Sequence, residues 1–341
     1  MSVNKSIFNL RPLGFAWETN DPFLFCVHHQ DAYPKGNDQL GPAASLAGRD
    51  IGQDFTPRDG WRMYHGEAVP GFPAHPHRGF ETVTVVLDGF VDHSDSHGAA
   101  GRYGNGDVQW MTAGRGLQHA EMFPLLDQDG PNRMELFQIW LNLPGSKKFV
   151  SPHYKMLWAE EMAKVHREDS QGKNIQITLI AGELDGVRAL APAPDSWAAD
   201  PEHGVAIWII EMEAGATWSL PSAPDTVIRA LNFFAGSSLK AAGVNIPAYH
   251  GFEVQPEDEI KLEAGAEPVR LLLLQGCPIG EQVVQYGPFV MNSEREIRQA
   301  YEDYRRDEFG GWPWTRSDPV HGRSKGRFAR YADGTEETKD G

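Results

Sequence analysis

Apolar and polar residues alternate over short stretches of this chain, and glycine, proline, aspartate or asparagine separate the stretches. The segment from Glu135 to Leu143 shows the pattern best, because every second residue of it is apolar, as in a sheet strand with one fully apolar face. That face is formed by Phe137, Ile139, Leu141 and Leu143. Several such strands, spaced roughly ten residues apart, indicate an all-β sandwich or barrel.

In the first half, residues 15–70 read as short strands and long loops. Glu81 to Leu87 is rich in β-branched residues and ends at Asp88-Gly89, a dipeptide typical of tight hairpin turns, so we expect a strand, a turn and a second strand there. Gly104 to Asp107 predicts another turn, followed by a strand over residues 108–111.

Residues 144–175 are polar and are expected to connect two domains, with a short helix around Trp158 to His166. The strand pattern then begins again, which favours two copies of one β fold, the second of them degenerate. The strands expected in the second copy are Ile175 to Ala181, Val205 to Met212, Thr226 to Phe234 and Val269 to Gln275.

One helix is expected near the C-terminus. Ser293 and Glu296 form a capping box, and the residues after them have apolar side chains at helical spacing up to Tyr304. The helix should close at Gly310-Gly311. Trp312 to Tyr331 should form an extended arm that packs by its aromatic side chains, and Ala332 to Gly341 should be frayed.

The composition and the charge of the chain exclude several classes of function. The 31 basic and 47 acidic residues give a net charge of −16, which disfavours direct binding to nucleic acid. Cys26 and Cys277 lie far apart and form neither a disulfide framework nor a zinc motif. The sequence predicts neither a signal peptide nor a membrane span, so the expected location is the cytoplasm.

The chemistry is concentrated in two triplets, His75-Pro76-His77 and His119-Ala120-Glu121. Residues i and i+2 of a strand point to the same face, so two neighbouring strands would gather three imidazoles and one carboxylate around a point. These donors suit Fe, Mn, Ni, Cu or Zn. Four protein ligands on an octahedral ion leave two positions open for a substrate or dioxygen.

Other candidates have simpler explanations. A bare His-Pro-His is common on protein surfaces, and only the second triplet makes it a metal motif. His93 and His97 are expected in a loop, as solvated or rim residues, and His28-His29 could lie near the mouth of a pocket. Gly101 to Gly106 is glycine-rich but lacks the helix that a phosphate site needs. The basic run near the C-terminus is interpreted as a solvated tail: Arg323, Lys325, Arg327 and Arg330.

The spacing of these residues resembles the two consecutive motifs of the cupin superfamily. The first is Gly71-x3-His75-x-His77-x3-Glu81-x7-Gly89, and the second is Gly106-Asp107-x4-Thr112-Ala113-Gly114-x4-His119. The segments His75 to Thr82, Gly106 to Gly116 and His119 to Met122 further resemble the signatures of the pirin family, as do Leu136 to Leu143 and Gly287 to Asn292. The resemblance runs from about residue 20 to residue 310.

This resemblance implies two consecutive cupin barrels, which are double-stranded β-helices of the jelly-roll type, with a short C-terminal helix. The expected parts are a metal-binding cupin over residues 15–150, a cupin without a metal site over residues 151–290, and the helix and arm over residues 291–341. The stretch from Leu220 to Thr226, where the first motif should recur, contains no histidine.

The resemblance also implies one divalent metal ion, Fe²⁺ in first place, with Ni, Mn, Cu, Co or Zn left open. Its ligands would be His75, His77, His119 and Glu121. In many other cupins a glutamate at the position of Glu81 is a ligand, whereas the pirin pattern leaves this carboxylate to orient a ligand histidine or its neighbour. Glu81 therefore stays a second candidate, ranked below the other four.

Some pirins resemble flavonol 2,3-dioxygenases, which cleave quercetin and release carbon monoxide. This activity would take a small phenolic substrate and dioxygen, with Glu121 as the base that removes the hydroxyl proton. The alternative is a non-enzymatic, iron-dependent redox-sensing regulator that acts through a protein partner. A cupin isomerase or storage-type binding protein is a third hypothesis.

Overall fold

The structure is a computed structural model that describes residues 6–339. The described chain forms two compact units that are not simple halves of the sequence. The first unit comprises residues 27–159 and 281–339, and the second comprises residues 6–26 and 160–280. Compared with the expected consecutive domains, residues 15–26 therefore join the second unit, and the C-terminal helix and arm join the first.

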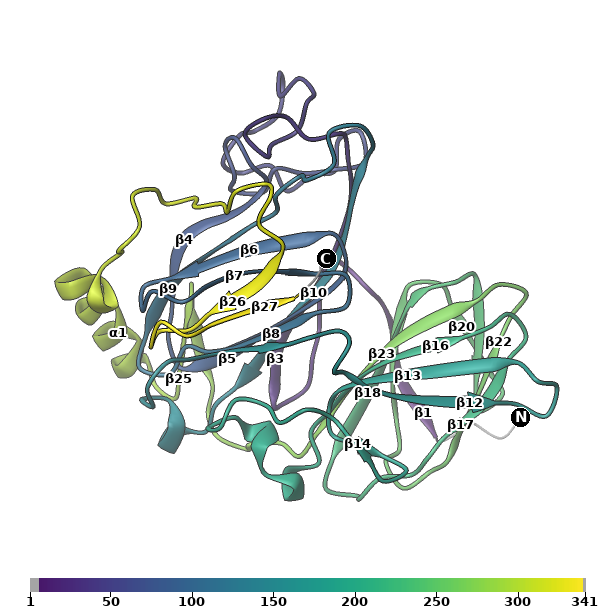
Figure 1. The fold of residues 1–341 in the computed structure, drawn as a ribbon. Helices are drawn as coiled ribbons and strands as arrows, with labels where there is room; N and C mark the ends of the chain where they lie inside the picture. Colours follow the sequence, from purple (N-terminus) through teal and green to yellow (C-terminus); the bar gives the residue numbers. More distant parts are fainter. Residues whose placement is uncertain (1–5, 340–341) are drawn as a thin grey trace. The chain divides into compact units, whose positions relative to one another are not determined.

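The first unit is a pair of antiparallel sheets (Figure 1). One sheet has the strand order β11-β8-β5-β10-β3, and the other has the order β27-β26-β7-β6-β9-β4. The strands are β3 (Phe23–Tyr33), β4 (Gly71–His77), β5 (Phe80–Asp88), β6 (Phe90–Asp95), β7 (Ala100–Gly104), β8 (Val108–Thr112), β9 (Leu117–Met122), β10 (Asn132–Asn142), β11 (His153–Leu157), β26 (Arg327–Arg330) and β27 (Glu336–Lys339). Between β4 and β9 the chain passes repeatedly from one sheet to the other, as in a jelly roll.

The strand, the turn and the second strand predicted around Asp88-Gly89 are confirmed, but the two strands do not pair as the hairpin that this dipeptide favours. β5 pairs with β8 and β10, whereas β6 pairs with β7 and β9, so the turn carries the chain from one sheet to the other. The backbone amide of Gly89 donates a hydrogen bond to the Asn105 side chain, and the Gly89 carbonyl accepts one from the Asn105 amide. The two crossovers therefore stabilise each other across the end of the barrel.

The predicted strand around Glu135 to Leu143 is confirmed as β10. Phe137, Ile139 and Leu141 are fully buried, and the opposite face carries the half-buried side chains of Gln138 and Trp140. β10 is thus apolar on one face and carries polar and aromatic groups on the other, which is the face that matters for the site below.

The second unit repeats the two-sheet plan. One sheet has the order β1-β21-β18-β23-β16-β13-β12, and the other has the order β17-β22-β19-β20. The strands are β1 (Ile7–Pro12), β12 (Ala163–Glu168), β13 (Asn174–Ala181), β16 (Ala206–Met212), β17 (Thr217–Leu220), β18 (Ile228–Ala235), β19 (Ser238–Ala241), β20 (Val244–Pro247), β21 (His250–Val254), β22 (Ile260–Ala264) and β23 (Val269–Gly276). Its core is aliphatic and aromatic throughout, and the four predicted strands of this copy are confirmed.

Short elements complete the two units. They are β2 (Ala16–Trp17), β14 (Glu183–Leu184), β15 (Val187–Arg188), β24 (Val284–Tyr286), β25 (Phe289–Met291) and the 3₁₀ turns η1 (Gly145–Lys147), η2 (Trp197–Ala199), η3 (Pro201–His203) and η4 (Glu308–Gly310).

The expected helix around Trp158 to His166 is wrong. The segment instead leads into β12, which pairs with β13 over six residues, and Val165 packs into the core of the second unit. The expected connection over residues 144–175 likewise contains β11, which pairs with β8. Polar residues alternate with buried ones at the start of β11, and only Val165 is buried in β12, so these two edge strands have the polar composition of a loop.

The C-terminal helix is confirmed as α1 (Glu294–Asp307). The Ser293 hydroxyl accepts a hydrogen bond from the Glu296 amide, as the capping box requires. The helix ends earlier than predicted, because Glu308 adopts a left-handed conformation with φ of 51°. Within residues 6–339, no helix is both long and apolar enough to cross a membrane.

The prediction that the chain is frayed from Ala332 onward is wrong for the residues that the structure describes, because β27 pairs with β26, which in turn pairs with β7. The final two positions of that segment, 340 and 341, lie outside the described residues.

A pH dependence of stability is expected where α1 meets the end of β4. Burial raises the pKa of Asp303, but hydrogen bonds from Arg78, Gln299 and Arg306 outweigh this effect and lower it to about 2. A lowered carboxyl pKa contributes stability above the unfolded value near 4, and that stability is lost as the pH falls towards 2.

We expect Asp303→Asn to lower the free energy of unfolding by about 1 kcal/mol at pH 6, a small effect because solvent screens this carboxylate. At pH 2 the substitution should leave the free energy of unfolding almost unchanged. Urea unfolding of both proteins at pH 6, 4 and 2 measures the difference. A difference that stays constant across this range would contradict the assignment.

Candidate metal centre

Three histidines of the first unit meet on two neighbouring strands. His75 and His77 lie on β4 and His119 lies on β9, and one ring nitrogen of each lies within 4.8 Å of those of the other two. The strands are antiparallel, with His75 directly opposite His119. The sequence prediction that these three side chains share one face is therefore met by the structure.

The local sequence explains how β4 presents this pair. β4 is the edge strand of its sheet and contains Pro73 and Pro76, which an edge strand tolerates because its outward amides need no partner. The pairing with β9 shifts register between Phe72 and His75. Gly71 precedes this bulge with φ of 131°, and a Cβ atom there would collide with the Glu121 carbonyl oxygen, so only glycine fits.

Hydrogen bonds orient two of the three rings. His75 donates from Nδ1 to the Pro73 carbonyl at 2.9 Å, and His77 donates from Nδ1 to the Pro288 carbonyl at 3.4 Å. In the neutral imidazole this leaves Nε2 of each ring as a lone-pair donor. A carbonyl that holds the second ring nitrogen is the usual companion of a metal-binding histidine.

His119 is the strongest sign that a metal belongs here. It is fully buried, and within residues 6–339 neither of its ring nitrogens has a hydrogen-bond partner. An unsatisfied buried polar group costs about 1–3 kcal/mol. A divalent cation coordinated by all three rings would give one of the two His119 nitrogens a partner, so the residues present fit a metal ion.

The charge state of the histidines also suits coordination. Burial lowers the pKa of His75 to about 4, and burial together with the neighbouring histidines lowers the pKa values of His77 and His119 well below the usual range. All three rings are therefore neutral at pH 7, which is the form that binds metal ions.

Glu121 lies beside the three histidines without belonging to their cluster. Its Oε2 atom is 3.8 Å from His119 Nε2. Two ligand atoms at about 2.1 Å from one ion lie at most about 4.2 Å apart, so this separation allows both to bind the same ion. Burial raises the pKa of Glu121.

The Glu121 carboxylate is held by three side chains from inside the barrel. Gln138 donates from Nε2 to Oε2 at 3.0 Å, and the Thr84 and Tyr103 hydroxyls lie 3.0 and 3.4 Å from Oε1. Each hydroxyl has one hydrogen and a second, nearer acceptor, which is Gln138 Oε1 at 2.7 Å for Thr84 and Gln109 Oε1 at 3.0 Å for Tyr103.

Glu81 is fully buried on β5, and Thr112 donates a hydrogen bond to its Oε1 atom at 2.6 Å. It is not one of the residues whose ligand atoms cluster with the histidines.

The interpretation of His93 as a solvated or rim residue is wrong. His93 lies on β6, is fully buried, and stacks on Tyr154 with ring centroids 4.9 Å apart. Its ring centroid is 5.5 Å from that of His119, and its Nε2 atom is 3.6 Å from Asp95 Oδ2. The polar composition of the segment suggested a loop, and because both faces of β6 are buried, its sequence shows no alternation of polar and apolar residues that would have revealed the strand.

The other histidines named from the sequence, His28, His29 and His97, differ in burial. His97 is exposed, as expected. His28 and His29 are buried on β3, where the His28 ring hydrogen-bonds with Glu135 and the His29 ring lies 5.8 Å from that of Phe72.

Half-buried aromatic rings flank the histidine cluster. The Phe72 ring lies 6.4 Å from that of His75, and the Trp140 ring lies 5.3 Å from that of His77. Phe55 and His65, also half-buried, pack near Phe72. The surroundings of the cluster are thus suited to planar apolar groups.

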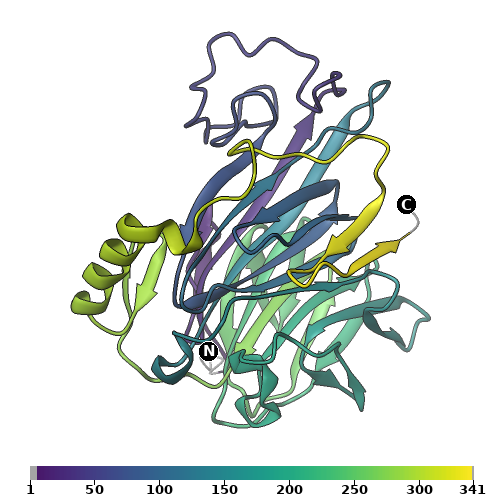
Figure 2. The same cartoon turned by 60° about the vertical axis from the view of Figure 1, so that its left-hand side comes forward.

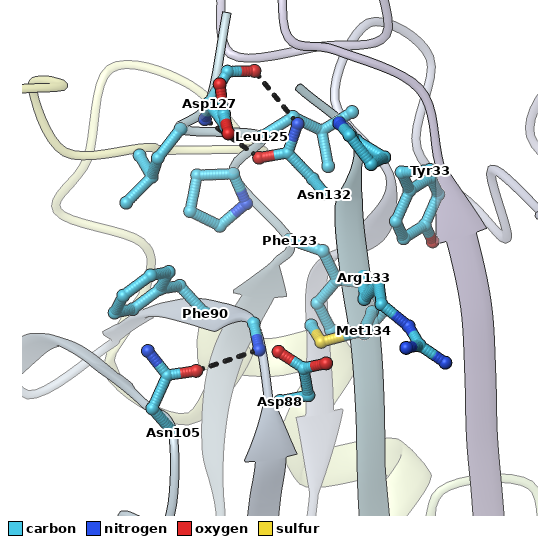
Figure 3. A pocket seen from close by; sticks show the side chains of 14 residues that line it. Tyr33, Asp88, Phe90, Asn105, Phe123, Leu125, Asp127, Asn132, Arg133 and Met134 are labelled. Atoms are coloured by element: carbon cyan, nitrogen blue, oxygen red, sulfur yellow. Dashed lines mark hydrogen bonds between the residues drawn. The ribbon is translucent and has the colours of Figure 1, made fainter. Parts of the chain in front are cut away.

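A separate cavity of about 210 Å³ lies in the first unit, where β5 crosses to β6 and β9 leads to β10 (Figure 3). Apolar side chains line much of it, and its polar groups bond to one another, as Asp127 and Asn132 do. None of the three clustered histidines lines this cavity.

Two jelly-roll units, the first with a histidine cluster on β4 and β9, define a bicupin protein. The sequence profile of the pirin family matches residues 14–141, and a second profile, the pirin C-terminal cupin domain, matches residues 207–310. The chain belongs to the pirin family.

Curated relatives agree with this membership. A pirin-like protein of Solanum lycopersicum is 34% identical over 262 residues, which cover 70% of this chain and 77% of the relative. A Pseudomonas aeruginosa protein named "Putative quercetin 2,3-dioxygenase" is 37% identical over 242 residues, covering 70% of this chain and 79% of that protein.

Among solved structures, a quercetin 2,3-dioxygenase from Acinetobacter baumannii aligns with a TM-score of 0.66 and 25% identity, covering 90% of this chain and 96% of that one. These comparisons, with the strand order above, confirm the predicted fold of two cupin barrels and a short C-terminal helix.

Proposed function

We propose that this chain is a metal-dependent dioxygenase of the quercetin 2,3-dioxygenase type, which uses dioxygen to open the ring of a phenolic substrate. The observation that carries the proposal is the cluster of His75, His77 and His119, with the unpartnered nitrogens of His119 at its centre. The names of the Pseudomonas and Acinetobacter proteins support the reaction type.

The metal proposed for the site is Fe²⁺, held by the Nε2 atoms of His75 and His77 and by a ring nitrogen of His119. Glu121 would be the fourth ligand. A bound ion of this kind would supply Lewis acidity towards a phenol oxygen and redox chemistry towards dioxygen.

Glu121 is proposed as the group that accepts the proton of the substrate hydroxyl. Its carboxylate lies against the side chains of Thr84, Tyr103 and Gln138, which set its direction. Because the Thr84 and Tyr103 hydroxyls each have a second acceptor, Oε1 can give up their hydrogen bonds and take up a proton.

Phe72 and Trp140 are proposed to contact the faces of the substrate rings. Both are half-buried and adjoin the histidines, so a planar phenol between them would displace water from the site. Quercetin is the proposed test substrate for this class.

The test is an aerobic assay of metal-loaded protein with quercetin. We expect the flavonol absorbance to fall and carbon monoxide to be released, and His119→Ala protein treated in the same way should do neither. Absence of both signals with Fe²⁺, Mn²⁺, Ni²⁺, Co²⁺, Cu²⁺ and Zn²⁺ would overturn the proposal. Identification of a protein partner bound differently by ferrous and ferric protein would then favour the regulator.

A further inference from the structure

The chain continues beyond the region that matches the pirin family, and this continuation belongs to the first unit. The second profile match ends at residue 310. Residues 312–325, which we call the strap, leave α1 and run to β26 beside the sheet that carries β4, β9 and β6 (Figure 1, Figure 2).

The strap is anchored by a fully buried ion pair. Arg102 on β7 donates to both carboxylate oxygens of Asp92 on β6, each at 2.7 Å. The same guanidinium donates to the strap carbonyls of His321, Gly322 and Lys325 at 2.7, 3.0 and 2.7 Å.

The Asp92 carboxylate completes this anchor. Its Oδ2 atom accepts a hydrogen bond from the His321 backbone amide at 2.7 Å. A buried charge is stable only when its hydrogen-bonding groups have partners, so the Asp92–Arg102 ion pair and the strap stabilise each other.

Beyond this anchor, the strap reaches the strand that carries two of the histidines. The Ser317 carbonyl accepts a hydrogen bond from the Ala74 amide at 2.7 Å, one residue before His75. β4 is an edge strand, and Pro73 and Pro76 cannot donate hydrogen bonds. The strap therefore uses a backbone donor that lies between two prolines and next to a ligand.

The strap also holds β6 behind His119. Trp314 donates from Nε1 to the Asp95 carbonyl at 2.8 Å, and the His321 ring donates to the His93 carbonyl at 3.1 Å. β6 pairs directly with β9, with Asp95 opposite His119. Residues outside the matched family regions thus support β4 directly, and they support β9 through its partner strand β6.

We propose that the strap is a positioning element of the metal centre: it fixes β4 and β6 so that His75 and His77 face His119 at coordinating distance. This inference rests on the proposed metal site. Its test needs a readout that does not depend on catalysis, and the strap offers a matched pair of tryptophans. The Trp314 side chain donates a hydrogen bond to the Asp95 carbonyl on β6, whereas the Trp312 side chain donates one to the Arg316 carbonyl within the strap.

The first measurement is amide hydrogen exchange of the metal-free protein over residues 71–77 and 90–95. Loss of one hydrogen bond corresponds to about fivefold in an opening equilibrium. We expect Trp314→Leu to raise exchange in these two segments by about fivefold and Trp312→Leu to leave it unchanged. Unchanged exchange in Trp314→Leu would overturn the proposal.

The second measurement is titration of the same proteins with Co²⁺ alone. Substitutions behind metal ligands typically cost 10- to 100-fold in affinity, so we expect about tenfold weaker binding for Trp314→Leu and wild-type binding for Trp312→Leu. Faster exchange with unchanged Co²⁺ affinity would reduce the strap to a purely structural role and overturn the proposal. If the wild-type protein failed to bind Co²⁺, both the role of the strap and the metal site would be overturned. If it bound Co²⁺ normally but did not turn over quercetin, only the proposed reaction would be overturned.

Discussion

His119→Ala is expected to abolish stable metal binding while leaving the two barrels folded. His119 is the proposed ligand that lies opposite His75, and neither of its ring nitrogens has a hydrogen-bond partner among the described residues. Changes behind a ligand already cost 10- to 100-fold in affinity, so loss of the ligand itself should cost more than about 100-fold. Elemental analysis after dialysis, with far-ultraviolet circular dichroism of the same samples, measures both parts of this expectation.

The control is His97→Ala, which removes an exposed imidazole from the same unit. It should retain the wild-type metal content. A metal content of His119→Ala equal to that of the wild-type protein would show that the ion binds elsewhere, and the ligand assignment would then be wrong.

Arg102→Ala is expected to destabilise the first unit strongly. It would leave the Asp92 carboxylate buried without its guanidinium and three strap carbonyls without their donor. Removing one partner of a buried ion pair costs about 3–5 kcal/mol. Urea unfolding should show this loss, and limited proteolysis should cleave the strap faster than in the wild-type protein.

Arg298→Ala is the matched control for this experiment. Arg298 forms an ion pair with Glu294 on the exposed face of α1, with side chains 68% and 83% exposed. Exposed pairs of this kind contribute at most about 0.5 kcal/mol. If Arg102→Ala and Arg298→Ala unfolded at the same urea concentration, the buried pair would not anchor the strap.

The sequence predicted the strands of both barrels because their apolar alternation is local. Their pairing is not local, and this is why Asp88-Gly89 favours a hairpin in the sequence although its flanking strands lie in different sheets. A turn dipeptide specifies a local conformation, whereas the sheet to which each strand belongs is decided by partners distant in the sequence, such as β8 and β10.

The three histidines of the site could be predicted because each triplet lies within one strand and i, i+2 spacing fixes the face. His93 could not be recognised in the same way, because aspartates and serines surround it in the sequence and these residues usually mark loops. They are buried here because Arg102 neutralises Asp92, and the amides of His97 and Ala99 bond to the Asp95 carboxylate. The burial of a polar segment depends on such distant partners.

The first unit is built from two separate stretches of the sequence, so its parts are synthesised at different times. All three histidines leave the ribosome long before the strap and β26, which are made only after the whole second unit. At 5 to 20 residues per second, roughly 10 to 40 s separate His119 from the strands that complete its sheet. We therefore expect the nascent chain to carry its three clustered histidines before the segments proposed to position them have been made, and selective metal loading to follow the synthesis of the strap.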